Sequence, residues 1–393
     1  MTQQQLKALA AELSALSLFR GLLDQPEMKA FLAFLASDGQ PHERMGLYGQ
    51  FVYSLGRHNG SFSDYLYRAA AEDENAYICN IAKGRAVSES LQANAEAELA
   101  LFSRLTVLTP QELCESVEHG YLPVFENTPI DFAAEYHQRI EQLDRYGYGI
   151  FAAAGMFRVE DKTIVPVEEP DRVSIDGFVG YAEERRKVLE NTRALIEGRP
   201  AANVLLCGDA GTGKSSTVKA CANYFYDQGL RLIEIRKDQL FSLSHVMGRI
   251  SGNPLKFIIF IDDLSFNKND DCFSMLKAAL EGSAGAKADN AVIYATSNRR
   301  HIVKEKFSER GHEDDVHHSD TVQELLSLSD RFGLTVYFGK PNKALYLDIV
   351  HELADRYGVK TERTELDRLA EAFALARGSR SPRAAEQFVK SLM

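Results

Sequence analysis

A glycine-rich stretch holds the residues best suited to chemistry in this chain. Within LLCGDAGTGKSS, the pattern G-x-x-x-x-G-K-S follows an apolar run and precedes a helical pattern. Glycines at this spacing let backbone N–H groups converge on phosphate oxygens, and the positive end of the following helix adds attraction. Lys214 can reach the β- and γ-phosphates of a nucleotide, and Ser215 can place its hydroxyl on Mg²⁺. The predicted phosphate site comprises Gly208, Asp209, Ala210, Gly211, Thr212, Gly213, Lys214, Ser215 and Ser216.

Two acids end a second apolar run and could complete that site. FIIFIDDLSF places Asp262 and Asp263 directly after five apolar residues. By position, Asp262 would hold Mg²⁺ through water, and Asp263 would orient or polarise an attacking water. A lone pair of acids is more often a helix cap or a surface feature. Its place after an apolar strand, downstream of a phosphate loop, favours the metal site.

One amide ends a third apolar run. YATSNRR places Asn298 where it could hydrogen-bond a γ-phosphate or a nucleophilic water without carrying charge. The alternative is an ordinary turn asparagine.

Five short apolar runs must position these side chains. They cover residues 203–207, 230–235, 256–261, 291–296 and 334–338, and helical patterns separate them. Continuous apolar strands alternating with helices are typical of a parallel sheet that is covered on both faces. The sequence therefore predicts an α/β fold with a five-stranded parallel sheet between layers of helices.

The chain divides into three predicted parts. Residues 1–165 show apolar residues three and four apart and are expected to form a mostly helical domain; Thr109 and Pro110 are the expected start of one helix. A change of composition around Pro166 and Pro170 indicates a linker. Residues 166–340 would form the nucleotide-binding domain, and residues 341–393 a helical lid whose last helix begins at Ser381-Pro382.

Composition narrows the class of protein. The 393 residues carry a formal net charge of −11, which argues against a broad nucleic-acid-binding face. Five scattered cysteines without a paired spacing favour a reducing cytoplasm. The first residues lack the pattern of a signal peptide, and no apolar run is long enough to span a membrane.

Taken in order, these motifs resemble the AAA+ ATPases over residues 170–393. GDAGTGKSS is similar to Walker A, FIIFIDD to Walker B, YATSNRR to sensor 1, SLSDRFGL to the arginine-finger segment and GSRSPRAAEQF to the sensor 2 helix. The longer run from FVGYAEERRKVLENTRALIEG to SLSDRFGL resembles a bacterial group of predicted AAA+ ATPases that is classed as a domain of unknown function. The resemblance implies ATP and Mg²⁺ as cofactors.

The resemblance also implies roles for two arginines. Arg331 would be a finger that enters the ATP site of a neighbouring subunit, whereas the alternative is an ion pair with Asp330 or another acid. Arg383 would contact the γ-phosphate from the lid of its own subunit, with Arg380 as the rival for that role.

By the same resemblance, the adenine would lie between the lid and the segment containing Phe178 and Val179, near Tyr346.

Three features depart from the AAA+ pattern. Asp263 stands where a longer glutamate is usual, and Asn267 stands where the related group usually has an acid, which predicts slow hydrolysis. Phe241 lacks the following glycine of a protein-threading loop. His312, His317 and His318 lie in a charge-dense segment and are expected to be solvated rather than to bind a metal.

The sequence therefore predicts an oligomeric AAA+ ATPase that hydrolyses ATP and remodels a protein partner chosen by the N-terminal domain. One alternative is a slowly hydrolysing, ATP-dependent switch or scaffold. Another is a helicase-loader-like ATPase that acts on nucleic acid, which the acidic balance disfavours.

Overall fold

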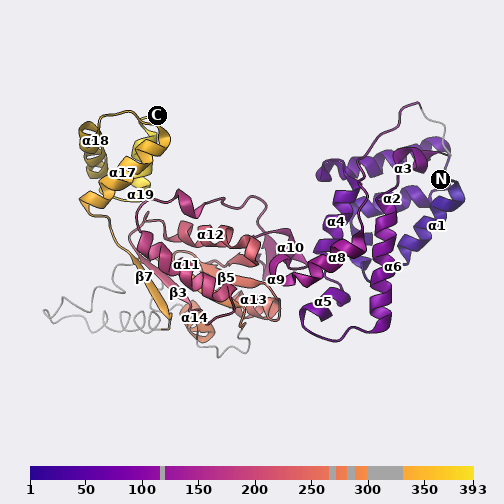
Figure 1. Cartoon of the computed structure of the whole chain (residues 1–393), viewed down its shortest axis with the longest axis horizontal. Helices are drawn as coiled ribbons and strands as arrows, with labels where there is room; N and C mark the ends of the chain where they lie inside the picture. Colours follow the sequence, from indigo (N-terminus) through magenta and orange to yellow (C-terminus); the bar gives the residue numbers. More distant parts are fainter. Residues whose placement is uncertain (116–119, 265–270, 281–287, 299–330) are drawn as a thin grey trace. The chain divides into compact units, whose positions relative to one another are not determined.

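The computed structural model describes residues 1–115, 120–264, 271–280, 288–298 and 331–393 (Figure 1). The chain divides into two compact units, Met1–Ala153 and Ala154–Met393. The first unit ends before residue 165, where the sequence placed the boundary, and each unit is considered by itself below. Among the helices in these ranges, none has both the length and the apolar character needed to cross a bilayer.

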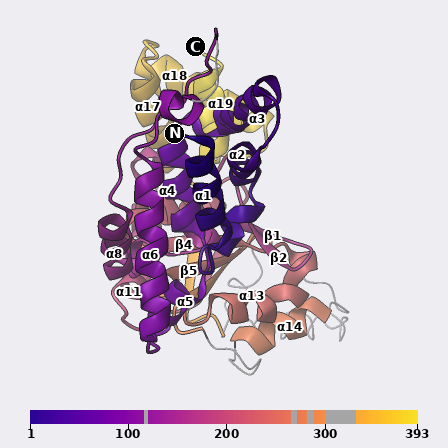
Figure 2. The same cartoon turned by 90° about the vertical axis from the view of Figure 1, so that its right-hand side faces the viewer.

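The first unit is built of helices, as its apolar spacing predicts. Figure 2 shows its longest helix, α6, with α8 beside it. Thr109 and Pro110 begin α7 as expected, since the Thr109 hydroxyl accepts a hydrogen bond from the Glu112 N–H at 3.2 Å. The helices are α1 (Gln3–Ser14), α2 (Pro26–Ala36), α3 (Pro41–Ser54), α4 (Phe62–Glu72), α5 (Ala76–Ala82), α6 (Glu89–Leu105), α7 (Pro110–Cys114), α8 (Phe132–Glu141), α9 (Leu143–Tyr146) and α10 (Ile150–Ala153), with short 3₁₀ turns at η1 (Arg20–Asp24) and η2 (Leu55–His58).

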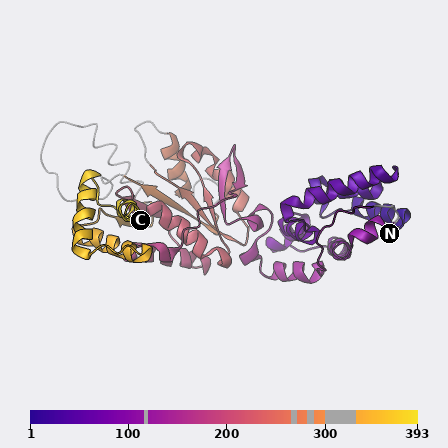
Figure 3. The same cartoon turned by 90° about the horizontal axis from the view of Figure 1, so that it is seen from above.

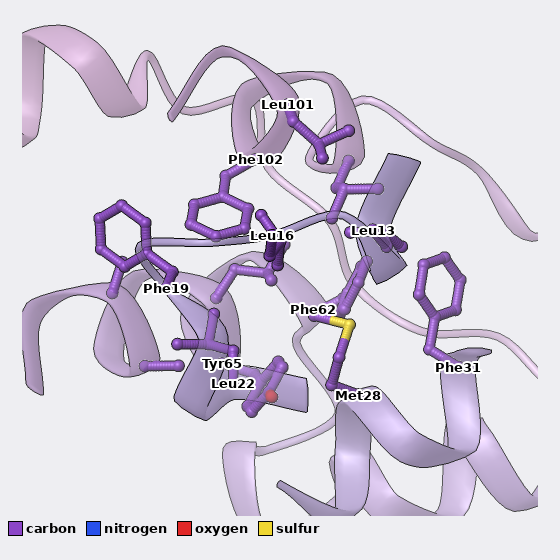
Figure 4. Packing of buried hydrophobic residues seen from close by; sticks show 14 of the residues in the cluster. Leu13, Leu16, Phe19, Leu22, Met28, Phe31, Phe62, Tyr65, Leu101 and Phe102 are labelled. Carbon is purple, nitrogen blue, oxygen red and sulfur yellow. The ribbon is translucent and has the colours of Figure 1, made fainter. Parts of the chain in front are cut away.

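An aromatic and aliphatic core holds these helices together (Figure 4). The rings of Phe19 and Phe102 meet edge to face with centroids 5.2 Å apart. The buried carboxylate of Glu98 accepts hydrogen bonds from the backbone N–H groups of Ser17 at 2.7 Å and Leu18 at 3.0 Å. The Glu98 carboxylate on α6 thus holds the segment that follows α1, because it accepts hydrogen bonds from backbone N–H groups that have no helical partner.

The described residues of the second unit contain a seven-stranded sheet in the order β2-β1-β4-β5-β6-β3-β7. The five predicted strands are present and parallel, with β3 between β6 and β7. Strand β5 is buried at five consecutive residues, which requires cover on both faces because side chains alternate across a sheet. The strands are β1 (Met156–Glu160), β2 (Thr163–Pro166), β3 (Val204–Gly208), β4 (Leu230–Glu234), β5 (Lys256–Ile261), β6 (Ala291–Ser297) and β7 (Leu334–Phe338).

Strands β1 and β2 correct the expected domain boundary and the expected strand number. They form a hairpin in which β1 pairs parallel to β4 and β2 pairs antiparallel to β1. Residues around Pro166 that were expected to be linker therefore extend the sheet. The turn joins the strands through Asp161 and Lys162, both left-handed at φ 44° and 69°, without the glycine that usually marks such a hairpin.

Helices cover both faces of the sheet, as predicted. On one face, α11 (Ala182–Ile196) and α12 (Lys214–Tyr224) bring Val188 and Val218 into a core that also contains Leu206 and Phe260. Figure 2 shows α13 (Leu243–Ile250) and α14 (Asp271–Leu280) together on the side away from α11. The 3₁₀ segments of this unit are η3 (Ile175–Gly177), η4 (Tyr226–Gln228) and η5 (Lys237–Ser242).

Three helices form the C-terminal lid (yellow in Figure 3). They are α17 (Lys343–Tyr357), α18 (Arg363–Ala376) and α19 (Pro382–Lys390), and they share a core that includes Val350, Leu366 and Phe388. Ser381 caps α19 as expected, because its hydroxyl accepts a hydrogen bond from the Ala384 N–H at 3.2 Å.

Candidate nucleotide-binding site

The glycine-rich loop leaves β3 through a turn that only glycine can make. Gly208 has φ +134°, and a Cβ there would lie 2.0 Å from the carbonyl oxygen of Phe338 on β7. Gly213, with φ +91°, precedes the first residue of α12. The loop therefore reverses the chain between strand and helix and leaves the first N–H groups of α12 without intrahelical acceptors, which suits a phosphate.

Lys214 is buried at the base of this loop. Its side chain is 5% exposed, and its ammonium donates to the carbonyl oxygens of Gly208 at 3.0 Å and Asp209 at 2.7 Å. A third hydrogen bond, at 2.9 Å, goes to Oδ1 of Asn298. Burial lowers the pKa of Lys214, and nearby acids oppose that effect. An ammonium held by neutral oxygens is well placed to gain from an anionic partner.

The predicted acids reach the same place because their strands are neighbours. Strands β5, β6 and β3 are adjacent and parallel, so their carboxyl ends meet at one edge of the sheet. Ser215 at the start of α12 donates to Oδ1 of Asp262, which follows β5, at 2.6 Å. Hydroxyl and carboxylate oxygens are thus in contact at the position predicted to bind Mg²⁺.

Asp263 has an unusual backbone conformation. Its φ is +50°, a left-handed value that costs a non-glycine residue about 1–2 kcal/mol. Hydrogen bonds offset that cost, because its N–H donates to Oγ1 of Thr296 at 2.9 Å and its carboxylate accepts from Nδ2 of Asn298 at 2.8 Å. The conformation points to function, since such strain is commonly stored at active sites.

Asn298 links the acid to the lysine. Its Nδ2 donates to Asp263 while its Oδ1 accepts from Lys214, so the two contacts fix the orientation of the amide. The side chain thus touches both the group expected to bind phosphate and the group expected to polarise water.

These residues surround a cavity of 220 Å³. Gly208, Asp209 and Thr212 lie beside it in the loop, where the Thr212 hydroxyl donates to the Asp209 carbonyl oxygen at 2.8 Å. The lining residues are Ala210, Gly211, Gly213, Lys214, Ser215, Ser216, Asp262, Asp263, Thr296, Asn298 and Arg383.

The lid contributes Arg383 and not Arg380 to this cavity. The N–H of Arg383, in the first turn of α19, donates to the carbonyl oxygen of Gly211 at 3.3 Å. Arg380 turns away and binds both carboxylate oxygens of Glu371, at 3.0 and 2.7 Å. Of the two rivals considered from the sequence, Arg383 is therefore the one beside the phosphate loop.

A larger pocket of 370 Å³ adjoins the loop between the segment before α11 and the lid. Phe178 and Val179 line it, as expected, and the guanidinium of Arg185 lies over the Phe178 ring, 4.9 Å from its centroid. Burial lowers the pKa of Arg185. On the lid side, Ile349 and Leu353 supply apolar lining. Its size and mixed lining suit a nucleotide base and sugar.

Tyr346 was expected beside the adenine, and the structure corrects this. The side chain is fully buried in the lid core and its hydroxyl donates to the carbonyl oxygen of Ala370 at 3.2 Å. It does not line the pocket, and the residues of α17 that do so lie further along the helix, at Ile349, Leu353, Arg356 and Tyr357. Tyr346 is therefore part of the lid's packing.

Arg331 lies far from the cavity of its own chain. It precedes β7 by three residues, whereas the phosphate loop follows the opposite end of the paired strand β3. At about 3.3 Å per strand residue, that places it roughly 20 Å from the loop. Asp330, its alternative ion-pair partner, falls outside the described residues, as do Asn267 and the three histidines His312, His317 and His318.

Three side chains of the site were not assigned from the sequence. Thr296 was visible only as a polar residue at the end of a strand, without a stated role. Arg185 and Arg356 line the larger pocket, but each occupies an ordinary charged position on an amphipathic helix, so no sequence signal distinguishes them.

The donor set fits Mg²⁺. This ion takes one or two carboxylates and completes its shell with water and substrate phosphate. Ser215 and Asp262 offer such oxygens, whereas the described residues contain no cluster of three or more His, Cys, Asp or Glu arranged for a protein-only metal cage. Ser215 and Asp262 are therefore the residues that would hold the ion.

Comparison with solved structures finds distant similarities to this chain. The chain is similar to the Thermotoga maritima RuvB Holliday junction branch migration motor at 16% identity with a TM-score of 0.36, covering 56% of this chain and 63% of that one. A single-substitution variant of the same protein gives 16% identity and a TM-score of 0.37 over the same shares. The chain thus spans less than two thirds of RuvB.

No curated protein matches the chain. One family matches residues 152–393, which is more than half of the chain and begins at the edge of the second unit. The resemblance to a group classed as a domain of unknown function is thereby confirmed. The chain belongs to the family described as "Protein of unknown function (DUF815)", and the matched residues include the whole of its mostly parallel sheet.

Proposed function

We propose that this chain is an ATPase that binds ATP with Mg²⁺ at Lys214 and hydrolyses it. The observation that carries the proposal is the convergence of Lys214, Asp262, Asp263 and Asn298 on one cavity beside a glycine-rich loop. Phosphoryl transfer depends on positioning the reacting groups and on neutralising the charge of the phosphates, and these side chains could serve both purposes.

Each side chain of the site has a separate role in this reaction. The Lys214 ammonium would exchange its bonds to neutral oxygens for bonds to the β- and γ-phosphates, and Ser215 and Asp262 would hold Mg²⁺. Bound Mg²⁺ supplies charge neutralisation across the phosphates. Asp263 takes a proton from the attacking water at its carboxylate, and the Asn298 amide keeps that carboxylate turned into the cavity.

Arg331 would complete the site of a neighbouring copy. Its place at the far end of β7 rules out contact with the phosphate loop of its own chain, because an arginine side chain spans far less than roughly 20 Å. Among the described strands, β7 is the last one of the sheet in that direction. A homo-oligomer in which this edge faces the next subunit would use the arginine as a finger.

The N-terminal unit would select a protein partner. It has its own core and a helical surface, and the nucleotide site lies entirely in the second unit. The net charge of −11 favours a protein partner over nucleic acid and suits a protein dissolved in the cytoplasm. Nucleic-acid binding that rises steeply as salt is lowered would instead support the loader-like alternative.

The second candidate is a slow ATP-dependent switch, and one observation favours it. Asp263 is an aspartate held in a strained conformation, and its carboxylate is already engaged by Asn298. A shorter, engaged acid should polarise water weakly. Tight ATP binding with turnover below about one per minute would place the chain in this class.

The test is ATP turnover measured against protein concentration, with the Arg331→Ala variant mixed into wild type. A finger acting between copies predicts that turnover per chain rises with concentration. It also predicts that Arg331→Ala alone lowers the rate about 10³–10⁵-fold and that adding this variant to wild type lowers the turnover of the wild-type chains. Turnover per chain that does not change with protein concentration or with mixing would reject a site shared between subunits. ATP binding without measurable turnover would support the second candidate, the ATP-dependent switch.

A further inference from the structure

Thr296 occupies a position between the two acids that no motif assigns. It is the penultimate residue of β6 and is 2% exposed. Its hydroxyl oxygen is 2.6 Å from Oδ1 of Asp262 and 2.9 Å from the backbone N of Asp263. A single side chain thus contacts both carboxylate-bearing residues at the end of β5.

The directions of these two hydrogen bonds follow from chemistry. The N–H of Asp263 can only donate, so the Thr296 oxygen accepts there. The hydroxyl has one hydrogen, which is left for the carboxylate of Asp262. The β-branched side chain has a restricted χ1, so it holds these directions with little loss of freedom.

The first consequence is that the two oxygens of Asp262 become different. Oδ1 accepts from Thr296 and from Ser215, each at 2.6 Å, and from the Asp263 N–H at 3.1 Å. Oδ2 has no hydrogen-bond partner among the described residues, and the side chain lines the cavity. Thr296 therefore helps to turn Oδ2 toward the space where Mg²⁺ would lie.

The second consequence concerns Asp263. Two hydrogen bonds hold its left-handed backbone in place. The Asp263 N–H donates to the Thr296 hydroxyl, and the N–H of the next residue, Leu264, donates to the Thr296 carbonyl oxygen at 2.7 Å. The carboxylate then meets Asn298. Without the hydroxyl, the backbone has one anchor fewer against relaxation to an ordinary φ.

We infer that Thr296 is a positioning residue that sets both acids, presenting one oxygen of Asp262 to Mg²⁺ and holding Asp263 in its strained conformation. The inference rests on the proposed function, because it assigns a role within the same Mg²⁺–ATP site. It predicts that loss of the hydroxyl impairs the response to Mg²⁺ more than the binding of nucleotide itself.

The test titrates a fluorescent ATP analogue into the full-length protein in EDTA and then at rising Mg²⁺. Thr296→Val keeps the shape and removes the hydroxyl. Its affinity in EDTA should stay within about twofold of wild type, whereas the Mg²⁺ concentration for half-maximal tightening should rise about tenfold, the usual effect of losing one hydrogen bond to a charged group. Thr296→Ser, which retains the hydroxyl, should return that concentration to within about threefold of wild type.

A matched control is Thr192→Val in α11. Thr192 is also fully buried and also hydrogen-bonded, to the Val188 carbonyl oxygen at 2.8 Å, but it lies outside the cavity. Its Mg²⁺ response should equal that of wild type. If Thr296→Val does not fold, Thr296→Ala, which leaves a smaller side chain in the same space, carries the same expectation.

Two outcomes overturn the inference alone. One is a Mg²⁺ response of Thr296→Val that superimposes on wild type. The other is an equal loss of affinity with and without Mg²⁺ that serine does not restore, which would make Thr296 a packing residue. Wild type that binds no ATP analogue under either condition overturns the proposed function together with the inference.

Discussion

Replacement of Asp263 by asparagine should separate catalysis from folding and binding. Asparagine is nearly the same size and tolerates left-handed backbone better than most residues, so φ +50° is retained. Its side-chain oxygen can still accept the hydrogen bond that Asn298 donates at 2.8 Å. The free energy of unfolding should therefore change by less than about 0.5 kcal/mol.

The expected loss is in turnover. An amide cannot take a proton from water, and a positioned general base contributes about 10²–10⁴-fold. Turnover by Asp263→Asn should fall by that factor, equivalent to about 3–5 kcal/mol in the activation barrier, with ATP affinity within about threefold of wild type. Phosphate release measures the rate, and titration calorimetry measures the affinity.

Two further variants separate backbone strain from lost chemistry. Asp263→Ala should be less stable than Asp263→Gly by about 1 kcal/mol, because only glycine adopts this backbone freely. Both should be as slow as Asp263→Asn. Turnover by Asp263→Asn above a third of the wild-type value, with binding unchanged, would refute the assignment of this acid.

Three other substitutions, two of them with a matched control, test separate parts of the structure. Gly208→Ala should lower the free energy of unfolding by more than about 2 kcal/mol, since the new Cβ meets a backbone oxygen at 2.0 Å, whereas Gly248→Ala in α13, with open space around it, should raise stability slightly in the same urea titration. Arg383→Ala should weaken ATP binding about tenfold by calorimetry, and Arg380→Ala should change it less than about twofold; the reverse ranking would exchange their roles. Burial raises the pKa of Asp73 to about 6, so its charge costs stability above that pH. Asp73→Asn should therefore stabilise the N-terminal unit by about 1 kcal/mol at pH 7.5, after allowance for partial exposure. That gain should fade as the pH drops through 6 toward 4, and a gain independent of pH would contradict the sign.

The sequence predicted the sheet well because its strands are buried on both faces. A continuous apolar run such as KFIIFI indicates a buried strand even when its neighbouring strands are not known. The phosphate loop and the two acids each follow such a run. The convergence of Lys214, Asp262 and Asn298 was predictable for the same reason, because the ends of parallel strands share one edge.

The features that the sequence did not predict depend on contacts between residues that are far apart along the chain. The β1–β2 hairpin is short and turns through Asp161 and Lys162, so its strands could be identified only by the pairing of β1 with β4 and of β2 with β1. Tyr346 and Ile349 lie on one helix, and which of them faces the pocket depends on how the lid packs. The role of Thr296 depends on hydrogen bonds to two residues that follow another strand, which spacing along the chain does not encode.

The central claim is that Lys214 receives the phosphates of ATP, and calorimetric titration with Mg²⁺–ATP tests it most directly. Lys214→Met removes the buried ammonium at similar volume, and Lys219→Met removes an ammonium further along α12 that pairs with Asp171 at 2.8 Å. We expect Lys214→Met to weaken binding at least about 100-fold, as loss of charged hydrogen bonds worth about 3 kcal/mol implies, and Lys219→Met to remain within about twofold. Equal affinity of wild type and Lys214→Met for ATP would contradict the account.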